Sequence, residues 1–131
     1  MTHEFTLRTK YRSEFVDITS VIQDIISKQK VKNGICHIYI PHTTAGITIN
    51  ENADPDVISD IIASLDKLIP LKNNYKHMEG NSAAHIKASL MGSSQNLGFE
   101  NGKLILGTWQ GVFFTEFDGP RTRKVYLKIS E

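Results

Sequence analysis

Three histidines stand in polar surroundings that could support chemistry. His42 follows the expected end of a strand, and the hydroxyl side chains of Thr43 and Thr44 come directly after it. His77 and His85 are eight residues apart, across a loop and the first turn of an expected helix. Two imidazoles joined by a flexible loop can converge on one ion, although this spacing is not the i, i+4 pair of a helical zinc site. Taken alone, each histidine also fits an ordinary solvated surface position.

Acidic and amide side chains accompany these histidines. Glu51 stands at the end of the strand that is expected to follow His42, and Asn81 lies in the loop between the two later histidines. Positioned polar groups are concentrated in loops and at strand ends, because the scaffold beneath them is rigid. Glu51 and Asn81 are therefore candidates for orienting a ligand.

The histidines predict a metal site of a particular kind. Cys36 is the only cysteine, so a closed zinc site made of thiolates is excluded. Three neutral imidazoles with one open position are the composition of catalytic zinc sites. His42, His77 and His85 would therefore suffice to bind a divalent metal ion, zinc or magnesium, if the fold brings them together. The two other histidines are less suitable, since one is near the N-terminus and one alternates with apolar residues along a strand.

A second group of residues suggests the binding of an anion. Glu116 precedes a turn that is followed by Arg121 and Arg123, and Arg123 shares its strand face with apolar residues. A guanidinium on such a face needs a partner, either the carboxylate of Glu116 or an anionic ligand. Lys87 could join the two arginines in holding a phosphate. The chain contains no phosphate-binding Walker loop.

The periodicity of apolar residues predicts an α+β fold that is mainly antiparallel, like a sandwich or half-barrel, with two amphipathic helices and one short helix. Ser20 with Gln23, Asp54 and Ser82 are expected to begin the helices. Trp109 is expected to pack in the core. The expected strands cover residues 5–8 with 15–18 as a hairpin, 35–40, 46–50, 95–100, 103–109, 111–117 and 122–129, and the helices cover 20–31, 55–69 and 82–91.

Composition limits the class of protein. The 131 residues are 40% apolar, which is enough for one core, so residues 1–131 are expected to form a single domain. Lysine plus arginine (15) nearly balances aspartate plus glutamate (14), so nonspecific binding to nucleic acid is not expected. The sequence has no signal-peptide pattern and no apolar run long enough to span a membrane, which predicts a cytoplasmic protein without membrane contact.

Three sequence blocks resemble the YjbQ-like family, which carries the label secondary thiamine-phosphate synthase. They read PHTTAGITINEN at residues 41–52, HMEGNSAAHIK at 77–87, and GTWQ running on to EFDGPR at 107–121. The resemblance covers nearly the whole chain. Two places depart from the family pattern. Ala83 and Ala84 stand where many members have an acid, which must then come from elsewhere, for example Glu79, and residues 95–98 lack a common proline.

The resemblance implies a cyclic homotrimer with polar sites near the subunit boundaries, and it joins the three histidines into one site. It implies a phosphate-handling transferase that joins a pyrimidine diphosphate to a thiazole phosphate and releases pyrophosphate. The expected catalytic residues are His85, Glu51 and Glu116. The residues expected to bind the small phosphorylated substrate are Arg121, Arg123, Lys87, Thr44 and Asn81.

Two other functions remain open at this point. A metal held by the histidines could activate water to hydrolyse a small phosphate or amide. Alternatively, the protein could be a non-enzymatic module that binds a metal or an anion, and such a ligand would raise its thermal stability without any product being formed.

Overall fold

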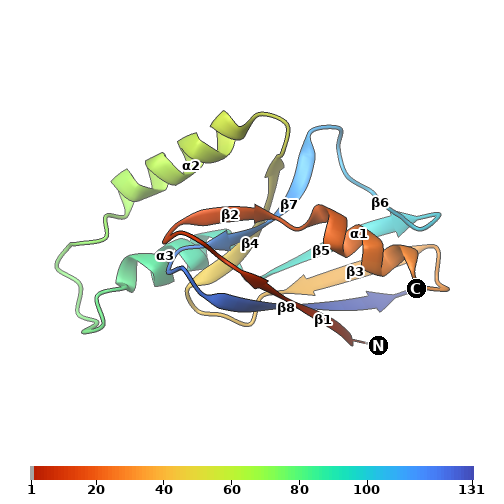
Figure 1. Ribbon diagram of the computed structural model, residues 1–131, viewed down its shortest axis with the longest axis horizontal. Coiled ribbons are helices and arrows are strands. Elements are labelled where there is room, and N and C mark those ends of the chain that lie inside the picture. The colour runs from red at the N-terminus through yellow and green to blue at the C-terminus, as the bar shows by residue number, and fades with distance from the viewer. Residues whose placement is uncertain (1) are drawn as a thin grey trace.

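The structure is a computed structural model that describes residues 2–131, and within them it contains eight strands and three helices (Figure 1). The elements are β1 (Thr2–Arg8), β2 (Glu14–Asp17), α1 (Thr19–Ser27), β3 (Gly34–Tyr39), β4 (Ala45–Glu51), α2 (Pro55–Leu68), α3 (Ser82–Met91), β5 (Ser94–Glu100), β6 (Lys103–Leu104), β7 (Gln110–Glu116) and β8 (Thr122–Ser130).

The strands form two sheets in which every pairing is antiparallel. A five-stranded sheet has the order β1-β8-β3-β5-β6, and a three-stranded sheet has the order β2-β7-β4. These sheets and the three helices confirm the predicted α+β class. Within residues 2–131, no helix is both long and apolar enough to cross a membrane.

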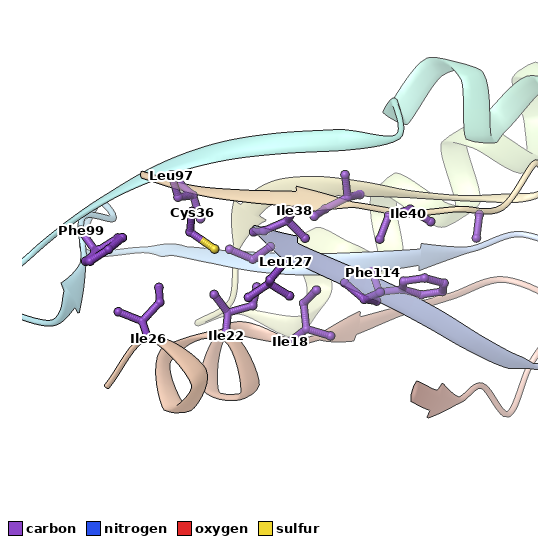
Figure 2. Close-up of a cluster of buried hydrophobic side chains, with 14 residues drawn as sticks. Ile18, Ile22, Ile26, Cys36, Ile38, Ile40, Leu97, Phe99, Phe114 and Leu127 are labelled. Carbon is purple, nitrogen blue, oxygen red and sulfur yellow. The ribbon is translucent and has the colours of Figure 1, made fainter. Parts of the chain in front are cut away.

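The main core lies between the two sheets and α1. Ile22 and Ile26 of α1 point toward the strands that carry Cys36, Ile38 and Leu127 (Figure 2). These five side chains are fully buried. Burying one isoleucine or leucine stabilises the folded state by about 1.5–3 kcal/mol, so this layer holds the sheets and α1 in place.

The strands β1 and β2 do not form the expected hairpin. Instead, β1 pairs with β8 and β2 pairs with β7, so the two neighbours in sequence belong to different sheets. The connection between them crosses from one sheet to the other, and Thr9 in this connection is buried. The hairpin prediction was wrong because both strands take partners more than 90 residues away in the sequence.

The first helix differs from its prediction at both ends. No side chain caps the N-terminus of α1, and the side chain of Gln23 instead bonds to the main chain of Gly102 and Leu104. The helix ends at Ser27, and Gly34 begins β3 rather than stopping the helix. A Cβ atom at Gly34 would lie 2.1 Å from the carbonyl oxygen of Ser130, so only glycine allows β8 to approach.

The other two helices lie close to their predicted bounds. Asp54 caps α2, accepting a hydrogen bond of 2.9 Å from the backbone N–H of Asp56. The short helix α3 ends before Gly92, whose φ of 88° suits glycine. Ser82 is not its cap, because Asn81 occupies the cap position and makes no capping hydrogen bond.

Trp109 is exposed rather than buried, so the expectation of core packing was wrong. Its side chain is 64% exposed. The strand expected to end at Trp109 is only the two-residue β6, which pairs through Phe99↔Leu104 and Glu100↔Lys103. Past Leu104 the chain leaves the sheet, and Trp109 lies in an open loop.

Cys36 should be inert in the folded protein. Burial raises the pKa of its thiol to about 11, so almost none of the reactive thiolate forms near neutral pH. A disulfide reagent at pH 8 should titrate one thiol per chain in 8 M urea and almost none in buffer. Rapid titration in buffer would contradict the position of Cys36 in the core.

Candidate functional site

A buried ion pair joins the two sheets. Glu116 of β7 is fully buried, and Arg123 of β8 is 5% exposed. The Nε atom of Arg123 donates to Oε1 of Glu116 at 2.8 Å, and Nη2 donates to Oε2. Glu116 also accepts hydrogen bonds from the hydroxyl of Thr9 and from the backbone N–H groups of Phe117 and Asp118. Such complete pairing offsets the cost of burying both charges.

The same arginine fixes the turn between β3 and β4. Nη2 of Arg123 donates to Oγ1 of Thr44 at 2.8 Å and to the Thr44 carbonyl at 3.4 Å. Arg123 is thus bonded to the protein itself, and Thr44 is 6% exposed. Arg123, Glu116 and Thr44 were expected to touch substrate or take part in catalysis, and the structure places them beneath the surface as supports of this turn.

His42 occupies the place where β3 stops pairing with β8. The last pair of that ladder is Tyr39↔Tyr126, so the backbone N–H of Lys124 has no partner on β3. Nε2 of His42 accepts a hydrogen bond of 2.9 Å from this N–H. The imidazole therefore takes the position of a strand carbonyl, and its orientation is set by β8.

The surroundings of His42 favour the neutral ring. Partial burial, followed by the positive charge of Arg123, lowers the pKa of the His42 imidazole below its ordinary value. The ring also packs edge-on against Phe114, with 6.5 Å between the ring centroids. An apolar wall and a nearby guanidinium both oppose a second positive charge.

A groove runs between α3 and the turn that joins β3 to β4, and two of the expected histidines line it. Its volume is about 470 Å³. His85 reaches it from α3, so side chains 43 positions apart in sequence face the same space. The groove is lined by His42, Thr43, Ala45, His85, Ala88, Ser89, Gly92 and Ser93.

His77 lies beside His85. The two rings meet edge-on with 5.4 Å between centroids, and Nε2 of His77 is 3.9 Å from the carboxylate of Glu79. Even so, the part of the chain described, residues 2–131, contains no group of three histidine, cysteine, aspartate or glutamate side chains that could hold a metal ion. Nε2 of His42 is occupied by a backbone N–H. The expected three-histidine metal centre is therefore not formed within one chain.

Arg121 and Asn81 meet at the beginning of α3. Both bond to Oδ2 of Asp118, each at 2.9 Å, and Arg121 is exposed. No side chain caps the N-terminus of α3, whose N–H groups and dipole favour an anion. Among the described residues, the buried Oδ1 atom of Asn81 has no hydrogen-bond partner. These two predicted binding residues lie together, and Arg121 is open to a ligand.

Lys87 lies on another side of α3. Two positions separate it from His85, which is about 200° around a helix. Its ammonium group is buried and lies 2.5 Å from the carboxylate of Asp66 in α2. Lys87 lines a separate cavity of about 550 Å³ and ties α2 to α3. Neither Arg121 nor Arg123 lines this cavity, so Lys87 faces a different space from the two arginines of the expected phosphate clamp.

Glu51 lies at the far end of β4 from His42. The seven residues of that strand span about 20 Å. Glu51 lines a third cavity of about 380 Å³, together with Asn52, Asp54 and Phe113. Within one chain, Glu51 and the histidines therefore belong to different places.

Two groups that shape the site were missed from the sequence. The hydroxyl of Thr9 bonds to Glu116 across 107 positions of the chain. The main chain of Lys124 orients His42 across 82 positions. Arg123 on an apolar strand face was a usable signal for the buried pair, whereas neither of these groups has a local sequence pattern that could have revealed it.

Comparison with known proteins gives matches along nearly the whole chain. The family model described as UPF0047 protein YjbQ-like matches residues 3–131. A UPF0047 protein of Methanocaldococcus jannaschii is 59% identical over 98% of this chain and 94% of its own length. YugU of Bacillus subtilis is 52% identical over 94% of each chain.

Solved structures have the same fold. A protein of the yjbq/upf0047 family from Clostridium acetobutylicum is 58% identical and superposes with a TM-score of 0.96, covering 98% of this chain and 99% of its own. A hypothetical protein of Aeropyrum pernix is 35% identical with a TM-score of 0.94, covering 99% and 98%. The names of these four relatives state no activity.

Removing one partner of the buried ion pair should destabilise the protein strongly. Glu116→Gln leaves the guanidinium of Arg123 buried without a counter-charge, which should lower the free energy of unfolding by about 3–5 kcal/mol. The matched control is Glu100→Gln, since Glu100 is exposed and its loss should change stability by less than about 0.5 kcal/mol. Urea denaturation measures both. Equal effects of the two substitutions would contradict the assigned pairing.

Proposed function

The chain belongs to the YjbQ-like UPF0047 family, and we propose that it is a transferase for small phosphorylated substrates with thiamine-phosphate synthase activity. The observation that carries the proposal is the groove shared by His42 and His85. His77 lies against His85, and Arg121 and Asn81 stand at the uncapped start of the same helix. Imidazole donors, a guanidinium and a helix N-terminus together suit a phosphorylated ligand.

The proposed reaction is a substitution at carbon that needs no oxidant or reductant. The bond between the methylene carbon of the pyrimidine and the diphosphate oxygen breaks, and pyrophosphate leaves with the electron pair. The ring nitrogen of the thiazole phosphate supplies the pair for the new carbon–nitrogen bond. Negative charge develops on the leaving oxygen, so the protein accelerates the step by placing hydrogen-bond donors there.

The residues would divide this work according to their positions. His42 and His85 face the groove and donate to oxygens of the leaving group. Arg121 donates to the second phosphate at the start of α3, and Asn81 helps to position it by bonding to the same carboxylate of Asp118. Glu116 and Arg123 act indirectly, by fixing Thr44 and β8 beneath His42. Lys87 holds α2 in place through Asp66.

Substitution of His85 should abolish most of the reaction that joins the pyrimidine to the thiazole phosphate. His85→Ala removes a donor that faces the groove, and positioned acid–base groups contribute about 10²–10⁴-fold to rates. The matched control is His37→Ala, because His37 is an exposed histidine on β3 bonded to Asn96. Release of pyrophosphate by purified protein, supplied with both substrates, measures the reaction. Unchanged turnover in His85→Ala would contradict the assignment of the groove as the active site. An inactive wild-type protein would contradict the proposed reaction itself.

We further propose that the protein assembles as a homotrimer in which Glu51 of one copy faces the histidine groove of the next. Large apolar side chains are exposed on the elements that carry both groups: Met78, next to His77, is 95% exposed, and Leu90 of α3 is 62% exposed. Trp109, next to the Gln110 that pairs with Glu51, is 64% exposed. Contacts between unlike surfaces form a closed ring when the rotation closes. Such a ring would bring Glu51 of one copy close to the histidine groove of the next, although the two lie about 20 Å apart within one chain.

Mixing two inactive variants should restore activity if sites are shared between copies. His85→Ala and Glu51→Ala should each be inactive, but in hybrid trimers some boundaries have both wild-type residues. Random assembly of equal amounts makes about a quarter of the boundaries intact. Light scattering should give three times the chain mass of 14.7 kDa. A monomeric mass, or hybrid trimers without recovered activity, would contradict the shared site.

A further inference from the structure

The hydrogen bond to His42 determines which of its nitrogens carries the proton. The backbone N–H of Lys124 can only donate, and it lies 2.9 Å from Nε2 of His42. A nitrogen that accepts a hydrogen bond holds no proton. The one proton of the neutral ring is therefore on Nδ1.

The main chain imposes this arrangement. The β3–β8 ladder stops at Tyr39↔Tyr126, while β8 continues to Thr122, so the N–H of Lys124 needs an acceptor other than β3. Leaving a backbone N–H without a partner costs free energy. Ring rotation by half a turn would place a C–H group against this donor. The strand thus selects one tautomer and one orientation of His42.

We propose that His42 is held as a neutral imidazole that offers its Nδ1–H to the groove as a fixed hydrogen-bond donor for an oxygen of an anionic ligand. The anion is the phosphoryl or pyrophosphoryl group of the substrate, so this part rests on the proposed function. Lys124 is a positioning residue that acts through its main chain. The ring lines the groove and has Nδ1 as its one free polar atom.

The net effect of the surroundings agrees with this assignment, because burial and the charge of Arg123 outweigh the opposing charge of Glu116. Arg123, paired with Glu116, lies near His42, and partial burial and the charge of Arg123 both favour the uncharged ring by lowering its pKa. The apolar ring of Phe114 packs against it. A neutral donor also keeps its proton when an anion binds, so it contributes without any change of charge.

The hydrogen bond from Lys124 is also incompatible with His42 as a metal ligand. A metal ion on Nε2 would have to displace the N–H of Lys124. A metal ion on Nδ1 would force the ring proton onto Nε2, where two donors would then face each other. Metal-ligating histidines usually donate their other N–H to an acceptor, and here that position holds a donor. His77 and His85 meet no such obstacle.

Nitrogen NMR of protein labelled with ¹⁵N-histidine tests the tautomer directly. His42 is assigned as the signal pair that disappears in His42→Gln. We expect a proton on Nδ1 and none on Nε2 at pH 7.5 in the wild-type protein. Lys124→Pro removes the backbone N–H and should give a ring with Nε2–H populated, whereas the control Lys124→Ala keeps the N–H and should leave the tautomer unchanged.

Inorganic pyrophosphate and zinc chloride, each added alone, test the role of the donor. Pyrophosphate should shift the Nδ1 signal of His42, and it should bind Lys124→Pro about tenfold more weakly than Lys124→Ala, as expected for one lost hydrogen bond to an anion. Zinc should leave both His42 nitrogens unchanged.

Four outcomes would overturn the proposal: a wild-type His42 protonated on Nε2, an unchanged tautomer in folded Lys124→Pro, no response of Nδ1 to pyrophosphate, or zinc bound to either nitrogen. If Lys124→Pro fails to fold, the wild-type spectrum still decides the tautomer. If the wild-type protein releases no pyrophosphate from the two substrates, the proposed transferase activity is wrong. The tautomer of His42 is measured separately by NMR, so the two failures are distinguishable.

Discussion

The buried ion pair of Glu116 and Arg123 links the two sheets beneath the turn between β3 and β4, which lines the groove. Its carboxylate accepts bonds from the connection after β1 and from the turn after β7, and its guanidinium donates to Thr44. Two buried charges therefore hold together four segments of the chain: the connection after β1, the turn after β7, the turn between β3 and β4, and β8. Because a buried charge without its partner is so costly, these segments must fold together, and the orientation of His42 follows from their arrangement.

The strand β4 separates two polar ends of the molecule. One end carries the histidine groove and the start of α3, and the other carries Glu51 beside the exposed Trp109. Both ends come from the sequence blocks that resemble the family pattern. A chain that keeps reactive side chains on opposite ends of one rigid strand can unite them only through a second copy, which is the physical basis of the proposed trimer.

Local patterns predicted much of this structure, and long-range pairing explains what they missed. The strand β3, the Asp54 cap of α2 and the bounds of α3 depend on residues close in sequence. The partners of β1 and β2 lie at the other end of the chain, so no local pattern could assign them. Residue types made His42 and His85 candidates, but the hydrogen bond from Lys124 to His42 comes from the main chain, so the type of residue 124 could not predict it.

A crystal structure of the assembled protein with inorganic pyrophosphate bound would show directly whether His42 donates to an anion. We expect the anion in the groove between His42 and His85, with one oxygen within hydrogen-bond distance of Nδ1 of His42. Nε2 should remain bonded to Lys124, and Glu116 should remain paired with Arg123. An anion held by a released Arg123, or a metal ion on either nitrogen of His42, would contradict this expectation.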